Sequence, residues 1–249
     1  MNIALVLSGG TGTRIGSDIP KQYIRVGGRM LIAFCLDMFS RHERVDGIWI
    51  VAADEWKDEI LKECDNCGID RNAVKGFSLP GDTRQLSILN GLRDIDKYAR
   101  SDSEGSTDDP VVIIHDAARP NLTAEFVDKC LDVLENETRG QSPRFTEYDG
   151  VMPVLPMKDT VYFSESGDSV DRLLDRSRIY AGQAPEVYRL RKYIEANEKL
   201  LPDEILKING STEPAVLAGL KVAMIPGDEN NYKITTKEDL KRFESFISK

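Results

Sequence analysis

Apolar residues along the chain alternate between short continuous runs and positions at helical spacing. A continuous run suits a strand that is buried on both faces, whereas apolar positions three and four residues apart suit one face of a helix. The run from Ile3 to Leu7 is followed by a glycine-rich stretch and then by Leu31, Phe34, Cys35 and Met38 at helical spacing. The alternation continues with expected strands at 47–53, 73–79, 111–114 and 150–154 and expected helices at 56–63, 86–98 and 123–134. This order predicts an α/β fold with a mostly parallel sheet and helices on both faces.

One segment, from Met157 to Arg176, departs from this alternation. It has strand character on either side of Ser164–Asp168, where Ser, Gly and Asp residues favour a turn. We therefore expect a protruding β-hairpin arm at about 157–176. Because a lone hairpin is marginally stable, the arm packs either against a second copy of the chain or back on its own domain.

Length and composition limit the class of protein. The 249 residues, 41% of them hydrophobic, suffice for one large domain, so we expect residues 1–249 to form a single domain. A net charge of −9 disfavours a surface for nucleic acid or anionic lipid. The sequence shows no long apolar segment and no signal-peptide pattern, so we expect a cytoplasmic protein without membrane partners.

Cysteine and histidine add little chemistry. Cys64 and Cys67 have the spacing of a redox or half-zinc motif, but no second cysteine pair or neighbouring histidine completes a metal site. His115 follows a buried strand, which favours a structural role, and His42 is expected at the surface. The reactive groups are therefore expected among other residue types.

The most informative segment is the glycine-rich stretch Leu7–Gly16 with the Pro20-Lys21-Gln22 that follows it. Glycines directly after a strand let backbone N–H groups approach anionic oxygens, and Arg14 and Lys21 add positive charge. The stretch lacks the third glycine of a dinucleotide fingerprint and the Gly-Lys-Ser/Thr of a P-loop. It predicts a loop that binds a nucleotide triphosphate, with a simple strand-to-helix turn as the alternative.

Asp116 follows the apolar run 111–114 and precedes two alanines. This order places its carboxylate at the edge of the sheet, with room for a ligand beside it. Mg²⁺ takes one or two protein carboxylates together with phosphate oxygens, so Asp116 suits a metal that accompanies a bound triphosphate. Capping of the following turn is the alternative role.

Two further segments carry polar groups at expected sheet edges. Between residues 81 and 87, Arg84 and Ser87 lie one helical turn apart and can address the same ligand, although a helix start also explains this composition. Residues 227–235 form an expected polar turn that enters a short strand, and Thr236 caps the last helix. By itself, Lys233 has the character of a solvated surface lysine.

Together these segments resemble the 2-C-methyl-D-erythritol 4-phosphate cytidylyltransferase family and its close relative, the ribitol-5-phosphate cytidylyltransferases. The resemblance spans nearly the whole chain and rests on residues 7–22, 81–92, 115–120, 158–160, 175–176 and 231–235. It implies a modified Rossmann-like fold in which the hairpin arm completes a homodimer. It also implies transfer of CMP from CTP to a polyol phosphate, with Mg²⁺ as cofactor.

The resemblance assigns roles to individual residues. The catalytic cations would be Arg14, Lys21 and Lys233, and Asp116 would hold Mg²⁺. The polyol phosphate would be bound by Arg119 and, across the dimer, by Thr160 and Arg176. The CTP contacts would come from Ser8, Gly9, Gly10, Thr11, Gly12, Gly81, Asp82, Arg84 and Ser87.

Departures from the family pattern leave the acceptor open. Where these enzymes usually have Thr-Pro-Gln, the chain has Ala184-Pro185-Glu186, and Ser211-Thr212-Glu213 replaces Thr-Asp-Glu or Thr-Asp-Asp. Both 2-C-methyl-D-erythritol 4-phosphate and ribitol 5-phosphate therefore stay candidate acceptors. A nucleotidyltransferase for another sugar or polyol phosphate and a non-catalytic nucleotide-binding module are the alternatives to this function.

Overall fold

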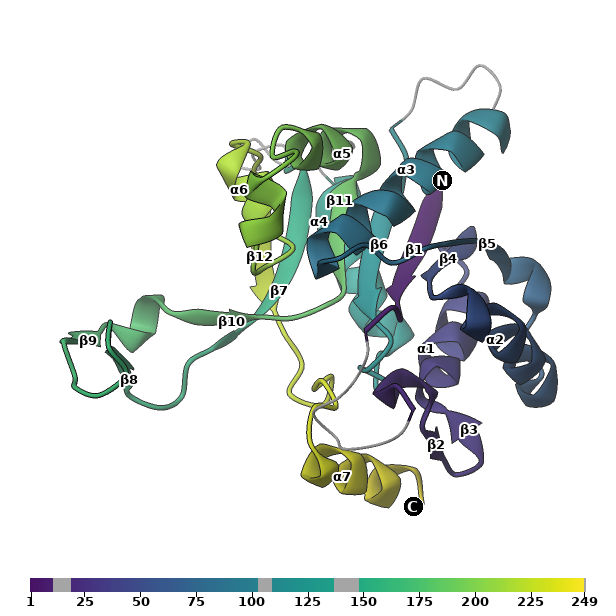
Figure 1. The fold of residues 1–249 in the computed structure, drawn as a ribbon, viewed down its shortest axis with the longest axis horizontal. Helices are drawn as coiled ribbons and strands as arrows, with labels where there is room; N and C mark the ends of the chain where they lie inside the picture. The colour runs from purple at the N-terminus through teal and green to yellow at the C-terminus, as the bar shows by residue number, and fades with distance from the viewer. Residues whose placement is uncertain (11–18, 103–108, 137–147, 249) are drawn as a thin grey trace.

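The computed structural model of the chain describes residues 1–10, 19–102, 109–136 and 148–248 (Figure 1). Eight strands of the described residues form one central sheet. Its order is β10 (Tyr180–Gly182), β7 (Gly150–Pro156), β11 (Glu186–Arg189), β6 (Val111–Asp116), β1 (Asn2–Leu7), β4 (Gly47–Val51) and β5 (Val74–Ser78), with β12 (Val222–Pro226) paired to β7.

The strands β6, β1, β4 and β5 are parallel to one another. Leu7 of β1 lies opposite Asp116 of β6, so the carboxyl ends of these two strands coincide. β11 runs antiparallel between β6 and β7, while β12 runs parallel to β7. The predicted mostly parallel sheet is therefore confirmed, with an antiparallel insertion that the alternation of elements did not indicate.

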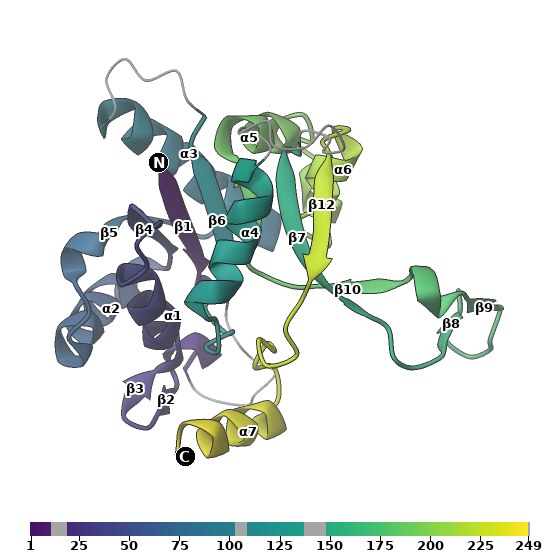
Figure 2. The same cartoon turned by 180° about the vertical axis from the view of Figure 1, so that it is seen from behind.

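Helices cover both faces of the sheet, as predicted (Figures 1 and 2). One face packs against α1 (Leu31–Ser40), α2 (Asp54–Cys67) and α4 (Ala124–Asn136), and the other against α3 (Arg84–Asp102) and α5 (Leu190–Glu198). Alternate residues of each strand serve the two cores: Ala4 and Val6 pack on the first, Ile3 and Leu5 on the second. The sheet is therefore buried on both sides, which explains its continuous apolar runs.

The last helix, α7 (Lys237–Ile247), lies beyond the carboxyl ends of β1 and β6, whereas the short α6 (Glu213–Leu217) lies near α5 (Figure 1). Phe243 of α7 joins Val26, Leu31 and Ile234 in a third apolar cluster, next to the small β2 (Arg25–Val26) and β3 (Arg29–Met30) hairpin. Thr236 caps α7 in a capping box with Asp239, which confirms the predicted cap.

The arm is a two-stranded hairpin of β8 (Val161–Phe163) and β9 (Arg172–Leu174). It projects away from the sheet in both views (Figures 1 and 2). Tyr162, Val170 and Leu173 are exposed on it, at 59%, 65% and 63% of their full surface. The alternative in which the arm folds back on its own domain is wrong, because its apolar side chains are not covered by this chain.

Two local predictions are also wrong. His42 is buried, with its side chain 3% exposed, because the turn after α1 lies against the start of α4, where the His42 Nε2 is 3.3 Å from the carbonyl of Ala124. Residues 233–235 form no strand, because their backbone groups bond to loops instead: the Ile234 N–H donates to the carbonyl of Ala118. None of the described helices has the length and apolar character that a membrane crossing requires.

Candidate functional site

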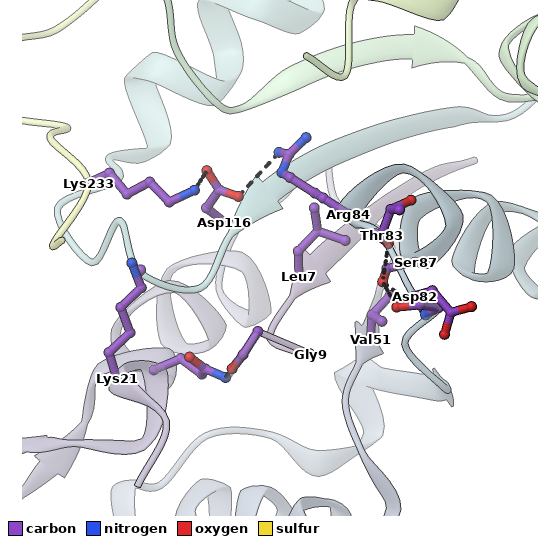
Figure 3. Close-up of a pocket in the computed structure, with 14 residues that line it drawn as sticks. Leu7, Gly9, Lys21, Val51, Asp82, Thr83, Arg84, Ser87, Asp116 and Lys233 are labelled. Carbon is purple, nitrogen blue, oxygen red and sulfur yellow. Dashed lines mark hydrogen bonds and ion pairs between the residues drawn. The ribbon is translucent and has the colours of Figure 1, made fainter. Parts of the chain in front are cut away.

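A cavity of about 450 Å³ opens at the carboxyl ends of β1 and β6 (Figure 3). Its walls come from several segments of the chain: the end of β1 with the glycines after it, the 3₁₀ turn at Lys21, the end of β4, the start of α3 with the turn before it, the end of β6, and the loop before α7 (residues 227–236). The lining residues are Leu7, Gly9, Gly10, Lys21, Gln22, Val51, Gly81, Asp82, Thr83, Arg84, Ser87, Asp116, Ala118 and Lys233.

Side-chain hydrogen bonds fix the turn after β1. The Gln22 amide, which is 4% exposed, donates to the carbonyls of Ser8 and Gly10 at 2.6 and 2.7 Å. The Tyr23 hydroxyl donates to the same Ser8 carbonyl at 3.0 Å, and the Ser8 hydroxyl donates to the carbonyl of Val51 at 2.7 Å. Ser8 is thus buried beneath the cavity, and Gly10 has open space beside it.

The turn before α3 packs closely against this one. A Cβ on Gly9 would lie 2.5 Å from the Cβ of Pro80, so only glycine allows the two turns to approach this closely. The Gly81 N–H donates to the Ser87 hydroxyl at 3.0 Å, and that hydroxyl donates to the carbonyl of Thr83 at 2.9 Å. These bonds hold the first turn of α3 open to the cavity.

Asp116 is the electrostatic centre of the cavity (Figure 3). The Lys233 Nζ lies 3.0 Å from its Oδ2, and an Arg84 nitrogen lies 3.2 Å from its Oδ1. The Nε of Arg119 is a third neighbour, at 3.5 Å from Oδ2. Burial would raise the pKa of Asp116, but the charges of Arg84, Lys233 and Arg119 outweigh it and hold this pKa well below its usual value.

Asp116 and its three cationic neighbours carry a net charge of +2. Such a cluster favours a polyanion, because the cations lose no partner when phosphate oxygens replace the carboxylate. Within the described residues, no group of three or more His, Cys, Asp or Glu side chains could hold a metal. A lone carboxylate fits Mg²⁺ only when phosphate oxygens supply further ligands. The donor set therefore suits a metal that accompanies a polyphosphate.

Lys21 lies at the side of the cavity formed by the loop before α7. It begins a short 3₁₀ helix, Lys21–Tyr23, and its Nζ donates to the carbonyl of Ile234 at 2.8 Å. Arg119 makes a similar contact, since its guanidinium donates to the carbonyl of Asn231 at 2.7 Å. The loop before α7 therefore holds two cations from elsewhere in the chain and supplies a third, Lys233.

His115 is not part of this chemistry. It is fully buried, and its Nε2 lies 3.0 Å from the carbonyl of Arg119. Burial lowers the pKa of His115 to about 4, so the ring is neutral at pH 7. This agrees with the structural role expected from the sequence.

The structure brings together most of the residues expected to bind the nucleotide and the metal. Ser8 lies beneath the cavity and Arg119 beside Asp116, while the lining includes Gly9, Gly10, Lys21, Gly81, Asp82, Arg84, Ser87, Asp116 and Lys233. Thr160 and Arg176 do not join them: both are exposed on the arm, where Arg176 donates to the carbonyl of Lys158 at 2.7 Å. Thr11, Gly12 and Arg14 lie outside the described residues.

Sequence reasoning missed the support that Gln22 and Tyr23 give to the glycine turn. Gln22 stands in the Pro20-Lys21-Gln22 motif, but no role was expected for it. The available signal was a glutamine next to the expected catalytic lysine and directly before an apolar segment. A buried amide must find partners, and the carbonyls of a glycine turn are among the few without a regular ladder partner.

Comparisons with known proteins identify relatives along the whole chain. A family model described as 2-C-methyl-D-erythritol 4-phosphate cytidylyltransferase matches residues 2–249. The protein of that name from Rubrobacter xylanophilus is 32% identical over 252 residues, which cover 99% of this chain and 94% of the relative. A ribitol-5-phosphate cytidylyltransferase from Lactiplantibacillus plantarum is 29% identical over 254 residues, covering 100% and 99%. The crystal structure of 4-diphosphocytidyl-2C-methyl-D-erythritol synthase from Anaerococcus prevotii shares the fold, with a TM-score of 0.77 at 24% identity over 100% of this chain and 96% of that one.

Proposed function

Since the chain belongs to the 2-C-methyl-D-erythritol 4-phosphate cytidylyltransferase family, it is a cytidylyltransferase, and we propose that the cavity around Asp116 is its active site. The enzyme acts on 2-C-methyl-D-erythritol 4-phosphate or ribitol 5-phosphate, the two acceptors of its relatives. This proposal rests on the buried carboxylate of Asp116, which is held among three cations at the sheet edge. In the proposed reaction CTP binds there and its CMP moiety passes to the acceptor.

The chemistry needs charge and alignment rather than a general base. A phosphate monoester is already ionised near pH 7, so its oxygen can attack the α-phosphorus of CTP directly. A new P–O bond forms, the bond to the β-phosphate oxygen breaks, and pyrophosphate leaves with the bonding electrons. Lys21 and Lys233 would stabilise the negative charge that gathers during this exchange. Arg14 keeps its proposed role as a third catalytic cation.

The nucleotide contacts follow from the two glycine turns. Open space beside Gly10 would admit the triphosphate, and the turn at Gly81 with Asp82, Arg84 and Ser87 would bind the cytidine. Ser8, Gly9, Thr11 and Gly12 complete the proposed CTP contacts. Asp116 would hold Mg²⁺, which, when bound, neutralises the triphosphate and assists the departure of pyrophosphate.

We also propose a homodimer in which the arm completes the partner's site. The exposed apolar side chains of the arm need a surface to cover them, and Thr160 and Arg176 lie too far along it to line this chain's own cavity. Both would bind the acceptor phosphate across the dimer, together with Arg119. A single catalytic domain over residues 1–249 belongs to the same proposal, supported by the sheet that serves both cores. We further propose a cytoplasmic location, in line with the sequence pattern described above.

Release of pyrophosphate tests the reaction. The purified protein, with Mg²⁺ and CTP, is offered 2-C-methyl-D-erythritol 4-phosphate, ribitol 5-phosphate or glycerol 3-phosphate, and UTP replaces CTP in a parallel series. We expect turnover with CTP and one of the first two acceptors. Turnover with UTP alone would indicate another nucleotidyltransferase, and binding of CTP without turnover of any acceptor would indicate a non-catalytic module.

Subunit complementation tests the dimer. Arg176→Ala removes one cation of the arm, and Asp116→Asn removes the carboxylate of the cavity, so each homodimer should keep only a small fraction of the wild-type activity. A mixed dimer contains one site with a native cavity and a native partner arm, so mixing the two variants should restore activity. Failure of the mixture to gain activity, with exchange of subunits confirmed by mass spectrometry, would contradict the shared site.

A further inference from the structure

A second carboxylate, that of Glu186, lies behind the wall of the cavity. Glu186 begins β11 and pairs in register with Ile114 of β6. Since Ile114 and Asp116 are two residues apart in one strand, Glu186 lies on the same face of the sheet as Asp116. Glu186 is 8% exposed and is not among the residues that line the cavity.

Three hydroxyl groups surround the Glu186 carboxylate. Ser211 donates to its Oε1 at 2.5 Å, and Thr212 and Tyr188 donate to its Oε2 at 3.1 and 3.2 Å. Burial of a carboxylate is costly unless such donors satisfy it. The site is therefore built to keep an acidic group at this depth. Because hydroxyl groups can rotate to accept as well as donate, the same cage would also accommodate a glutamine.

The charged group that Glu186 influences is Arg84. Burial alone would lower the pKa of Arg84, but the negative charges of Asp116 and Glu186 raise it. In return, Arg84 opposes the rise that burial causes in the pKa of Glu186. The next residue, Gln85, is buried and donates to the Tyr193 hydroxyl at 3.1 Å, which ties the start of α3 to α5. Arg84 thus projects from a fixed helix end into the field of two carboxylates.

Glu186 and Asp116 differ in whether a bound ligand can reach their carboxylates. Asp116 faces the cavity, and in the proposed function it turns towards Mg²⁺ and CTP, which weakens its hydrogen bond to Arg84. Glu186 is closed off by its hydroxyl cage, so no ligand competes for it. We propose that Glu186 is a positioning residue that keeps Arg84 in place for the nucleotide once Asp116 is engaged. This inference rests on the proposed function of the cavity.

The hydrogen bond between Glu186 and Thr212 offers a second position for the charge. The Thr212 Oγ1 lies 3.1 Å from the Glu186 Oε2, so an aspartate at position 212 would place a carboxylate beside position 186. If the charge is what matters to Arg84, moving it from position 186 to position 212 should preserve the effect.

The test compares Mg·CTP affinity in E186Q, in E186Q/T212D and in the wild type. E186Q removes the charge but keeps the shape, so Kd and KM for Mg·CTP should rise about tenfold, the scale expected for loss of one nearby opposite charge in a partly screened site, while kcat changes about twofold or less. The double variant restores a carboxylate and should return both constants to within about threefold of the wild type. Calorimetry with Mg·CTP gives Kd, and pyrophosphate release gives KM and kcat.

Asp149→Asn is the matched control. Asp149 is another largely buried carboxylate, bound to Lys192 at 2.6 Å and to the Lys221 N–H at 3.0 Å, but it lies away from the cavity. D149N should lower Tm without changing the Kd of Mg·CTP. A Kd for E186Q within twofold of the wild type, or one in E186Q/T212D as high as in E186Q, would overturn the proposal. If E186Q fails to fold, the double variant decides alone: a Kd for Mg·CTP more than about threefold above that of the wild type would overturn the proposal. Lack of CTP turnover by the wild type would instead refute the proposed function.

Discussion

Replacing Asp116 by asparagine separates binding of the nucleotide from its turnover. The substitution keeps the shape of the side chain and raises the net charge of Asp116 and its three neighbours from +2 to +3. Turnover with Mg·CTP should fall by a factor of about 10² to 10³, the scale for loss of one preorganised electrostatic contact. Metal-free CTP should bind more tightly, by roughly fivefold, because one more uncompensated cation faces the triphosphate across a partly screened cavity.

The same variant has a defined effect on stability. Removing one partner of a buried ion pair costs about 3–5 kcal/mol, and we expect the lower end of that range because the Arg84 and Lys233 side chains are 36% and 33% exposed and can regain water. The pKa of Asp116 is held below its usual value, so its stabilising effect is complete above about pH 4 and is lost as the pH falls further. The stability difference between wild type and D116N should therefore be constant from about pH 5 to 8 and shrink in stronger acid.

Three measurements test these effects. Calorimetry with CTP in EDTA gives the affinity for metal-free CTP, pyrophosphate release with Mg²⁺ gives turnover, and urea unfolding at several pH values gives stability. Arg84→Lys, which keeps the charge but lacks the planar guanidinium, is a useful comparison, because it should affect CTP affinity without tightening metal-free binding. Turnover of D116N within a few-fold of the wild type would refute the reasoning. So would weaker binding of metal-free CTP by a D116N protein that is correctly folded.

Two further predictions concern the loop before α7. Lys21→Ala should lower kcat by about two orders of magnitude, since it removes one preorganised cation. The control Lys62→Ala, at an exposed lysine paired with Glu59, should leave kcat unchanged. Near-normal turnover of K21A would exclude a catalytic role for Lys21. Asp239→Asn should weaken the cap of α7 and lower the Tm at pH 7. Burial would raise the pKa of Asp239, but hydrogen bonds from residues 235 and 236 outweigh it and lower this pKa, so the difference in Tm should be full above about pH 4 and shrink as the pH falls further, which thermal unfolding across pH measures.

Much of the fold follows from the sequence because its central strands are buried on both faces. Residues 3–7 and 111–114 have only apolar side chains, and parallel pairing of two such strands places Leu7 beside Asp116. That pairing alone predicts that the glycine turn and the aspartate share one edge of the sheet. The antiparallel β11 could not be predicted in the same way, because its position between β6 and β7 depends on the long excursion of the chain through the arm.

The candidate site was predictable where a residue follows a strand and not where it lies in a loop. Asp116 and Gly81 are placed by the strands or helices next to them. Lys233 is seven residues past the last strand, and nothing in its own neighbourhood distinguishes it from a surface lysine; only the resemblance pointed to it. Glu186 was noted as a departure from the family pattern, but its relation to Arg84 needs the register of β11 on β6. The hydroxyl cage around it joins residues about 25 apart in sequence, which no local pattern reveals.

The loop before α7 links these observations, because it holds cations that belong to three parts of the chain. Ile234 accepts a hydrogen bond from Lys21 and is itself buried in the apolar cluster with Phe243 of α7. Its N–H donates to the carbonyl of Ala118, two residues after Asp116. The position of Lys21 therefore depends on how firmly α7 is docked, although α7 lines no part of the cavity. A weakened cap at Asp239 should for this reason raise the KM for CTP as well as lower Tm, and a change in Tm with unchanged kinetics would show that the loop is held by the sheet edge alone.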